Sequence, residues 1–426
     1  MTPEVKERIE QIRHGIVPEG YKKTKAGIMP EDWTEYTIGK CLERIERPVD
    51  VQADEMYTQI GIRSHGKGLF YKEPITGASL GNKAVFWVEP DCFVLNIVFA
   101  WEQAVSKTTQ KEVGMIGSHR FPMYRPIDGR VDVDYLITYM LTKRGKDILE
   151  AASPGGAGRN RTLGQDRFMK SKITLPSVEE QCRIAETLTA QNKTIELKET
   201  LLAEKQRQKK YLIQQLLTGK KRLPGFDGEW ACVKLGKISK KQKQKNKGFV
   251  YSLVLSNSAQ HGIIPQTDQF DKEIANEEHI DGYYIVHDGF FVYNPRISVT
   301  APCGPINRNE TGQTGVMSPL YTVFAVESEK VDNDFLRQYF SSSCWYRHMK
   351  SVANYGARHD RMSVSDEDFF RMPIPVPSVE EQQAIAHVLF TADKEIELLR
   401  QNLEQENQKK KALMQLLLTG VVRVKI

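Results

Sequence analysis

Two short polar loops carry the side chains with the clearest chemical potential, and that chemistry is hydrogen bonding to a nucleic acid. Each loop follows a short apolar run and contains glycine, which lets the backbone approach a phosphate group closely. Arginine, asparagine and glutamine form paired hydrogen bonds with base edges, and serine and histidine can support them. The candidate DNA contacts are Arg63, Ser64, His65 and Lys67 in the first loop, and Ser256, Asn257, Gln260 and His261 in the second.

A second matched set of polar and basic residues lies further along each half of the chain. It consists of Arg159, Asn160 and Arg161, which follow a glycine-rich stretch, and of Arg296, Arg358, His359 and Arg361. We interpret these residues as contacts to bases or phosphates, and ordinary hairpin loops remain the alternative. A lysine-rich run between residues 234 and 247 can attract phosphate groups without sequence preference, or can form a solvated loop.

The remaining motifs do not predict an enzyme. The sequence Y-N-P-R at residues 293–296 lacks the second proline and the aromatic residue of an adenine methyltransferase motif. The glycine-rich residues 155–158 are not followed by the G-K-S/T of a phosphate-binding loop. The six cysteines are scattered singly, so neither a disulfide framework nor a zinc site is expected. We therefore predict a non-catalytic chain with no metal and no cofactor of its own.

The elements that must position these loops are repeated. Residues 176–219 match residues 377–420 without a gap, and about half of the aligned positions are identical. Both copies begin with P-S-V-E-E-Q and end with L-T-G. Weaker similarity extends into the segments that precede each copy, including the surroundings of Trp33 and Trp230. The chain therefore contains an internal duplication, in which one structural unit occurs twice.

Each copy of the strict repeat predicts one long helix, roughly 60 Å long at 1.5 Å per residue. Ser177 and Ser378 are expected as N-caps in capping boxes, and Gly219 and Gly420 as C-terminal glycines. Apolar residues step by four and three, which predicts a coiled-coil seam that charged residues interrupt in the middle of each copy. Two such stripes in one chain favour antiparallel packing of the helices on each other. The predicted seam comprises Ile184, Leu188, Ile195, Leu202, Leu212 and Leu216 in the first copy, and Ile385, Leu389, Ile396, Leu403, Leu413 and Leu417 in the second.

The segments before the long helices predict β-rich domains of the α+β class. Short apolar runs between turn residues indicate strands at residues 84–88, 93–99, 283–286, 290–293 and 320–326, and helices are expected at residues 133–150 and 334–350. The predicted organisation is an N-terminal helix (1–19), a first domain (20–175), a central repeat helix (176–222), a second domain (223–376) and a C-terminal repeat helix (377–426).

The first residues of the chain add a detail to the repeat. Residues 9–15 resemble the end of the repeat helix at residues 213–219. This similarity predicts a circular duplication in which the two chain ends lie close together. An unrelated short amphipathic helix is the alternative.

Charge and hydropathy place the chain in a broad class. A net charge of +6 over 426 residues fits a nucleic-acid partner, although many other proteins have a similar charge. No apolar run approaches the ~18–20 residues of a membrane span. The charged N-terminus lacks the apolar region of a signal peptide, so we expect a cytoplasmic protein.

A globular domain, a short strand, P-S-V-E-E-Q and a long helix ending in L-T-G, all present twice, resemble the specificity subunit of type I restriction–modification systems. The resemblance covers essentially the whole chain. It implies two target-recognition domains, each of which recognises one half of a bipartite, asymmetric DNA target. It also implies that the paired helices set the length of the unread spacer between the half-sites.

The same resemblance implies the partners. These are double-stranded DNA, two modification (methyltransferase) subunits that use S-adenosylmethionine, and restriction subunits that act as ATP-dependent translocases and nucleases. Two alternatives from other classes stay open, namely a coiled-coil scaffold that does not touch DNA and a self-contained DNA-modifying enzyme. Tight binding of S-adenosylmethionine without a partner would indicate the enzyme, and acidic or neutral domain surfaces would indicate the scaffold.

Overall fold

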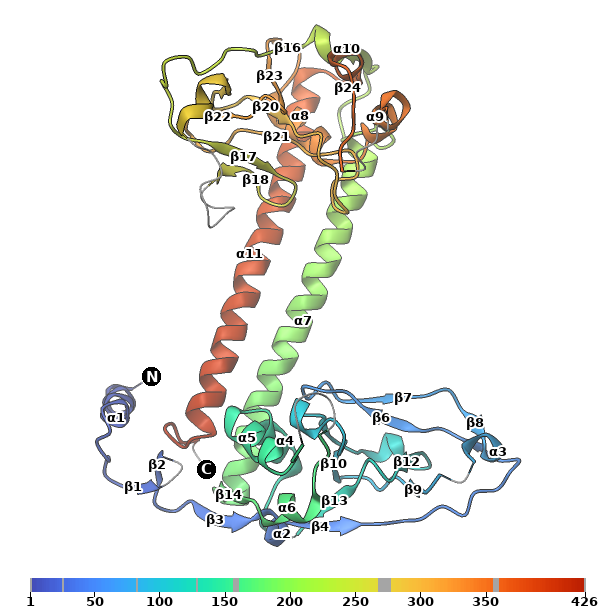
Figure 1. Ribbon diagram of the computed structural model, residues 1–426, viewed down its shortest axis with the longest axis vertical. Helices are drawn as coiled ribbons and strands as arrows, with labels where there is room; N and C mark the ends of the chain where they lie inside the picture. The colour runs from blue at the N-terminus through green and yellow to red at the C-terminus, as the bar shows by residue number, and fades with distance from the viewer. Residues whose placement is uncertain are drawn as a thin grey trace. The chain divides into compact units, whose positions relative to one another are not determined.

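The chain folds into two compact units. The computed structural model describes residues 2–24, 27–81, 83–127, 129–155, 161–266, 277–354 and 360–424. Unit 1 comprises Met1–Leu197 together with Leu403–Ile426, and unit 2 comprises Lys198–Asn402 (Figure 1). Within the described ranges, no helix is long and apolar enough to cross a bilayer.

Short strands and short helices build the globular part of unit 1. Its strands are β1 (Tyr21–Thr24), β2 (Gly27–Pro30), β3 (Thr34–Thr37), β4 (Leu42–Ile45), β5 (Met56–Tyr57), β6 (Ile60–Ile62), β7 (Leu69–Tyr71), β8 (Ile75–Thr76), β9 (Val85–Trp87), β10 (Phe93–Leu95), β11 (Val105–Lys107), β12 (Ile116–Ser118), β13 (Met123–Pro126) and β14 (Lys172–Leu175). Its helices are α1 (Pro3–Arg13), α2 (Ile38–Cys41), α3 (Gly77–Leu80), α4 (Val133–Met140), α5 (Lys143–Ala151) and α6 (Gln165–Lys170), with 3-10 turns η1 (Ala100–Glu102) and η2 (Gln110–Glu112).

The globular part of unit 2 uses the same kinds of element. Its strands are β15 (Ala231–Lys234), β16 (Ser239–Lys241), β17 (Leu255–Ser258), β18 (Gly262–Pro265), β19 (Tyr284–Val286), β20 (Phe291–Tyr293), β21 (Ile306–Arg308), β22 (Gly315–Met317), β23 (Thr322–Val326) and β24 (Pro373–Val376). Its helices are α8 (Asn333–Ser341), α9 (Tyr346–Val352) and α10 (Asp366–Phe370), with 3-10 turns η3 (Leu235–Lys237) and η5 (Glu277–Gly282).

The two units share one sheet plan. Unit 1 has a four-stranded antiparallel sheet in the order β11-β10-β13-β4, and unit 2 has the matching order β21-β20-β23-β16. Each unit also has a hairpin, β6-β7 or β17-β18, and a further pair, β9-β12 or β19-β22. Aromatic residues fill the cores, with Phe93 and Tyr124 against Phe168 in unit 1, and Phe291 against Phe324 in unit 2. The predicted α+β class and internal repeat are thus confirmed.

The helices after each sheet differ from the prediction. The sequence predicted one helix at residues 133–150 and one at 334–350, but each region forms two, α4 with α5 and α8 with α9. The hydroxyl of Thr142 caps α5 by accepting a hydrogen bond from the N–H of Gly145 at 3.2 Å. A Cβ on Gly145 would lie 2.3 Å from the Cα of Met140, so this glycine lets the two helices approach closely.

The two predicted long helices are present as α7 (Val178–Leu216) and α11 (Val379–Leu417). The hydroxyls of Ser177 and Ser378 accept hydrogen bonds from the third following N–H group, both at 3.3 Å, as N-caps do. Gly219 and Gly420 follow the helix ends with φ values of 68° and 70°, in the left-handed region that favours glycine.

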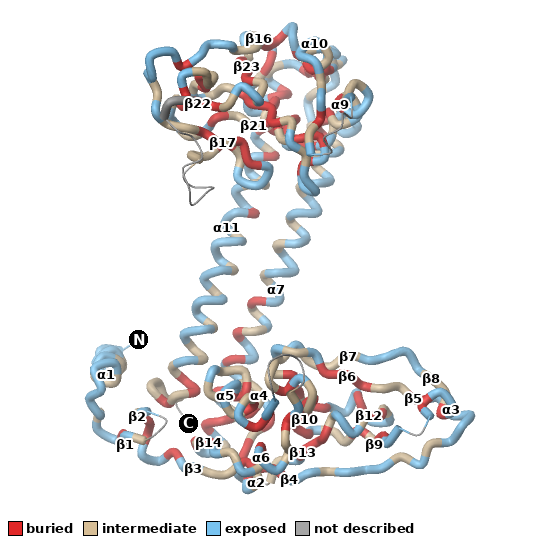
Figure 2. The backbone as a smooth tube through the Cα atoms, viewed as in Figure 1, coloured by how far each residue is buried: buried red, intermediate tan, exposed pale blue. Residues whose placement is uncertain are grey.

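The long helices pack antiparallel, as predicted. In unit 1, Ile184 near the start of α7 shares an apolar cluster with Leu417 at the end of α11. In unit 2, Leu216 at the end of α7 shares a cluster with Ile385 and Leu389 near the start of α11. Burial is concentrated in the sheets and at the helix ends, and the middle of each helix is mostly exposed (Figure 2). Of the twelve seam residues named above, all are buried except Leu202, Leu212, Leu403 and Leu413, which are half-buried.

Polar contacts replace the apolar seam toward the middle of the helices. In unit 2, Lys205 lies 2.7 Å from Glu395, and Lys209 forms an ion pair with Asp393. In unit 1, the side chain of Gln191 donates to the Glu406 carboxylate at 2.8 Å. These pairs explain why the apolar stepping in the sequence fails there.

A glutamine in the repeated P-S-V-E-E-Q motif ties each long helix to its own domain. Both glutamines are fully buried. The amide oxygen of Gln181 accepts from the backbone N–H of Asp132 at 2.9 Å, and its NH₂ donates to two carbonyls at 3.0 Å. Gln382 makes the equivalent bonds, with Asp332 N–H at 2.8 Å and two carbonyls at 2.9 Å.

The second glutamate of the same motif, Glu180 or Glu381, binds an arginine that follows the other long helix. Arg423 donates to both oxygens of Glu180 at 2.6 and 2.7 Å within unit 1, and Arg222 donates to both oxygens of Glu381 at 2.6 Å within unit 2. Both glutamates are 1% exposed. A buried, bidentate pair of this kind fixes an orientation as well as supplying energy.

Residues from both chain ends meet in unit 1. The hydroxyl of Tyr21 donates to the carbonyl of Gly420 at 2.8 Å, and Arg423 also donates to Asp32 at 2.8 Å. The segment after Gly420 therefore makes the contacts that the segment after Gly219 makes in unit 2. Helix α1 has no buried residue, whereas Leu216 and Leu417 at the ends of the long helices are buried. Gly15 follows α1 with a φ of 75°, so residues 9–15 resemble a repeat-helix end in their terminal glycine but not in their burial.

Candidate nucleic-acid interface

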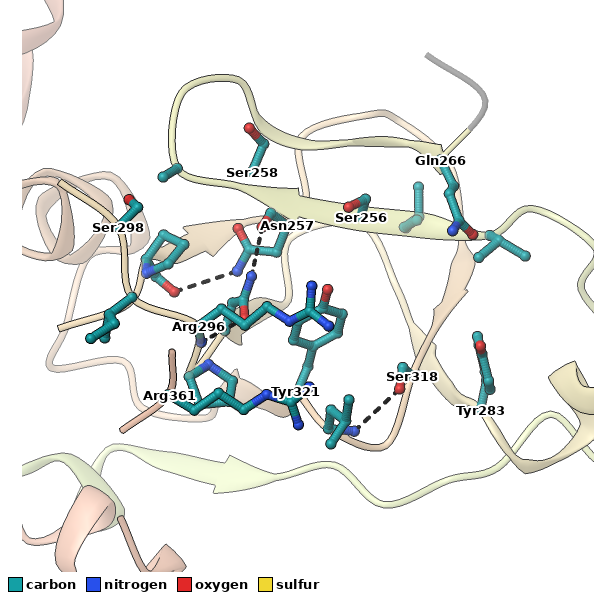
Figure 3. Close-up of a pocket in the computed structure, with 18 residues that line it drawn as sticks. Ser256, Asn257, Ser258, Gln266, Tyr283, Arg296, Ser298, Ser318, Tyr321 and Arg361 are labelled. Atoms are coloured by element: carbon teal, nitrogen blue, oxygen red, sulfur yellow. Dashed lines mark hydrogen bonds between the residues drawn. The ribbon is translucent and has the colours of Figure 1, made fainter. Parts of the chain in front are cut away.

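A cavity in unit 2 brings four of the predicted contact residues together. Ser256 and Asn257 lie on β17, and Arg296 and Arg361 lie on the opposite wall (Figure 3). The cavity has a volume of about 380 Å³. The exposed Gln260 and the exposed His261 lie outside this lining, in the turn of the β17-β18 hairpin.

Asn257 holds the hairpin on the sheet. It is 3% exposed, and its NH₂ donates to the carbonyl of Val292 at 2.7 Å while its amide oxygen accepts from Asn307 at 2.7 Å. Its own carbonyl accepts from Asn294 at 3.0 Å. Because these bonds occupy the Asn257 amide, this residue positions the cavity wall, and Ser256 beside it faces the cavity (Figure 3).

Backbone pairing places the two arginines side by side. Arg296 and Arg361 form an isolated antiparallel bridge, and the amide oxygen of Asn294 accepts from the N–H of Arg296 at 3.0 Å. Burial raises the pKa of Tyr321, and the two neighbouring guanidinium groups oppose that shift. Figure 3 shows both arginine side chains on the side of the cavity that carries Tyr321.

The matching hairpin of unit 1 directs its loop differently. The Arg63 guanidinium stacks over the Phe70 ring, 5.1 Å from the ring centre, and donates to the carbonyl of Leu69. His65 has a φ of 61°, and its N–H donates to the carbonyl of Glu102 at 2.8 Å. Arg63, His65 and Lys67 are exposed and do not line the adjacent cavity.

A cavity of about 430 Å³ lies beside the β6-β7 hairpin. Ser64 is the predicted residue that lines it, together with Asn96, Glu102 and Lys72. The Ser64 hydroxyl donates to the Glu102 carboxylate at 2.8 Å. The sequence reasoning missed Glu102, because this residue follows Trp101 in a segment that resembles ordinary core.

The second predicted set is only partly covered by the described residues. Arg159, Asn160, Arg358 and His359 lie outside them. Arg161 stacks over Trp101, 5.7 Å from the ring centre. Leu163 and Met362 make equivalent backbone bonds, to the carbonyls of Ile97 and Pro295, so the counterpart of Arg361 is Thr162, one residue from the predicted Arg161.

The six cysteines are free, and three of them are buried. Cys41, Cys92 and Cys303 are buried, and burial raises the pKa of the Cys92 thiol to about 11. Across the ranges that the structure covers, no group of three or more His, Cys, Asp or Glu side chains is arranged to hold a metal ion.

Comparison with known proteins identifies the family of this architecture. The family model described as "Type I restriction modification DNA specificity domain" matches residues 80–206 and 228–407, more than half of the chain. Two relatives from Methanocaldococcus jannaschii are each 24% identical over 96% of this chain and 97% of their own length. One is named "Putative type I restriction enzyme MjaX specificity subunit" and the other "Type I restriction enzyme MjaVIII specificity subunit".

Solved structures show the same fold. The HsdS subunit from Thermoanaerobacter tengcongensis aligns with a TM-score of 0.54 at 16% identity, over 92% of this chain and 98% of that one. The S subunit of a type I restriction-modification system from M. genitalium aligns with a TM-score of 0.51 at 12% identity, over 92% and 96%. With two repeated units, paired helices and a match over most of its length, this chain belongs to the family of type I restriction modification DNA specificity domains.

Proposed function

We propose that this chain is the DNA sequence-specificity subunit of a type I restriction–modification complex. In this proposal each unit recognises one half of a bipartite, asymmetric target in double-stranded DNA. The observation that carries it is a repeated scaffold with two unlike cavities, one lined by Arg296 and Arg361 and the other by Ser64 and Glu102. One scaffold with two different linings suits a protein that distinguishes two different half-sites.

The paired helices are proposed to set the unread spacer and to dock the partner subunits. Each of α7 and α11 contributes one part to unit 1 and the other part to unit 2. Exposed residues along the middle of both helices leave surface for other chains. The proposed partners are two methyltransferase subunits, which bind S-adenosylmethionine, and restriction subunits that translocate and cut DNA. The chain itself is proposed to be non-catalytic and to act in the cytoplasm.

Mapping of methylated adenines tests this function. Genomic DNA from cells that carry this protein and its partner methyltransferase should show a methylated bipartite sequence that is lost when the gene for this chain is deleted. The purified chain alone should not bind S-adenosylmethionine tightly. Tight binding of that cofactor without a partner would support a self-contained enzyme, and an unchanged methylation map after deletion would support a scaffold without DNA recognition.

A further inference from the structure

The cavity of unit 2 has both polar and apolar side chains in its lining, and its charged side chains are all cationic. Its two charged side chains are those of Arg296 and Arg361, and its described lining contains no carboxylate. Arg361 is the more enclosed of the two, with its side chain 25% exposed, and Arg296 is exposed. A ligand of this cavity must therefore supply hydrogen-bond acceptors.

Local bonds already occupy many of the cavity's own acceptor atoms. The amide oxygens of Asn257 and Asn294 accept from Asn307 and from the Arg296 N–H. The hydroxyl of Ser258 accepts from the N–H of Gln260 at 3.3 Å, and the hydroxyl of Ser318 accepts from a backbone N–H at 3.4 Å. These acceptor atoms bond within the cavity wall and not to the arginine side chains. The guanidinium groups are therefore available to a ligand.

The two guanidinium groups have little to bind within the protein. The Arg361 Nε is buried and makes no hydrogen bond, and its ion pair with Asp360 is 3.6 Å long. Among the described residues, the Arg296 side chain has no hydrogen bond or ion pair. Two like charges side by side, one with a buried donor that lacks a hydrogen bond, form a site whose donors a ligand would satisfy.

Of the four bases, guanine offers the best match to such a site. In the major groove guanine presents two acceptors, N7 and O6, whereas adenine and thymine present one each and cytosine presents an amino donor. An arginine fork binds the two guanine acceptors together. We propose that Arg296 and Arg361 select guanine in the half-site that unit 2 recognises, an inference that rests on the proposed function.

Shape favours a base over a phosphate group. The guanidinium groups line a cavity of about 380 Å³ next to the hairpin, and Arg361 is partly enclosed. A phosphate contact needs a cation that reaches out to the DNA backbone. The cavity also contains Gln266 and Tyr283, whose amide and hydroxyl oxygens can accept from the amino group of the cytosine paired with that guanine.

The test uses the full chain assembled with its methyltransferase subunits and a duplex that carries the mapped target. Each guanine of both half-sites is replaced in turn by 7-deazaguanine, which lacks the N7 acceptor. One replacement should weaken wild-type binding roughly tenfold, the discrimination expected of an arginine–guanine pair. The same replacement should cause no further loss in Arg296→Ala or Arg361→Ala.

Matched variants separate base recognition from phosphate attraction. Arg296→Lys keeps the charge but loses the fork, so base recognition predicts the same loss as Arg296→Ala, and phosphate contact predicts rescue. Arg347→Ala, at an exposed arginine of α9, is the control and should bind normally. The proposal fails if no guanine shows this dependence, if lysine rescues binding, or if the variants lose unrelated DNA equally. A wild-type complex without sequence preference would instead overturn the proposed function.

Discussion

Unit 1 and unit 2 present different chemistry from the same turn. In each unit a buried asparagine, Asn96 or Asn294, accepts a hydrogen bond at 3.0 Å from the N–H group two residues later. That later residue is Val98 in unit 1 and Arg296 in unit 2. The turn that the asparagine holds is the same in both units, but the residue at its end changes from valine to arginine. In this way one scaffold can serve two recognition sites.

The junction between each domain and its long helix shows the opposite behaviour. Gln181 and Gln382 make the same three hydrogen bonds, and each bond differs by no more than 0.1 Å between the units. The two cavities share the asparagine turn, but the charged side chains that line them differ. The units are therefore alike where the helix is anchored and unlike where a ligand would bind, and this contrast can be tested by paired substitutions.

The largest effect is expected from Gln181→Leu and Gln382→Leu. Each change leaves one buried N–H and two carbonyls without their partner, which should cost about 3 kcal/mol of unfolding free energy. Because the bonds match, the two losses should agree within about 0.5 kcal/mol. Urea unfolding followed by hydrogen exchange in each unit measures both values. Clearly unequal losses would break the equivalence of the two junctions.

A smaller and unequal effect is expected from Glu381→Gln and Glu180→Gln. Glu381 also accepts from the Trp230 indole at 3.1 Å, so its loss affects two donors. Arg423 keeps Asp32 as a second carboxylate when Glu180 is changed. We expect about 2–3 kcal/mol for Glu381→Gln and about 1–2 kcal/mol for Glu180→Gln. Hydrogen exchange at the starts of α11 and α7 checks the order, with Glu380→Gln as an exposed control.

The long helices could be predicted because their signals are local. Serine caps, terminal glycines and apolar steps act within one or two turns. The serine caps located the starts of α7 and α11 to within two residues, and the glycines located their ends to within three. The breaks at Thr142 and near Ser342 were missed because threonine and serine also occur inside helices, so one hydroxyl residue does not by itself mark a helix end. The close approach that Gly145 allows depends on a tertiary contact.

The site was predictable only where residues lie near the turns that carry them. Ser256, Arg296 and Arg361 were identified by residue type, and the structure places all three at one cavity. The roles of Asn257 and Glu102 could not be seen, since each depends on a partner about 35 or more residues away. Sequence patterns do not show which polar side chains form their hydrogen bonds within the protein and are therefore unavailable to a ligand.

An intermediate effect on recognition is expected from Glu102→Gln in unit 1. A carboxylate accepts hydrogen bonds, so this cavity suits a base edge with an amino group, the reverse of the arginine-lined cavity in unit 2. The change should weaken binding to one half-site by about 1–2 kcal/mol and leave the other unchanged. Methylation mapping with Glu150→Gln as the control measures this. Loss at both half-sites would mean that the cavities do not act separately.

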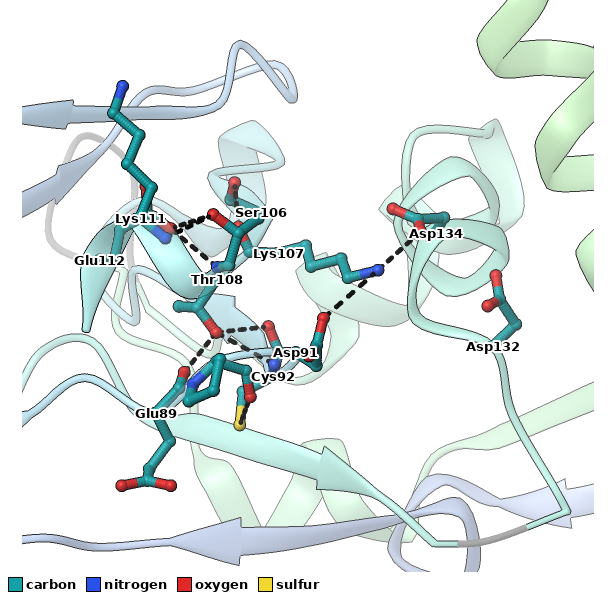
Figure 4. Close-up of polar contacts among 12 residues, drawn as sticks. Glu89, Asp91, Cys92, Ser106, Lys107, Thr108, Lys111, Glu112, Asp132 and Asp134 are labelled. Carbon is teal, nitrogen blue, oxygen red and sulfur yellow. Dashed lines mark hydrogen bonds and ion pairs between the residues drawn. The ribbon is translucent and has the colours of Figure 1, made fainter.

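A last contrast concerns one connection in each unit, from β11 to β12 in unit 1 and from β21 to β22 in unit 2. In unit 1 the turn is held by a carboxylate, because Glu112 accepts from the N–H of Thr109 at 2.7 Å and from the hydroxyl of Tyr71. Figure 4 shows Glu112 and Lys111 in this turn. In unit 2 the corresponding turn is held by the amide of Asn309, which donates to two carbonyls and accepts from Thr311. Only the first of these groups titrates.

Acid should therefore loosen the turn of unit 1 before that of unit 2. Burial raises the pKa of Glu112, but the hydrogen bonds from Tyr71 and Thr109 outweigh burial and leave the pKa below its ordinary value. A lowered folded pKa gives stability that is present above the unfolded value of ~4.3 and is lost as the pH falls through the folded value. Amide protection near Glu112 should fall as the pH is lowered below ~4.3, while protection near Asn309 holds. Glu112→Gln should remove this pH dependence, and equal acid sensitivity of both turns would show that the carboxylate does not set it.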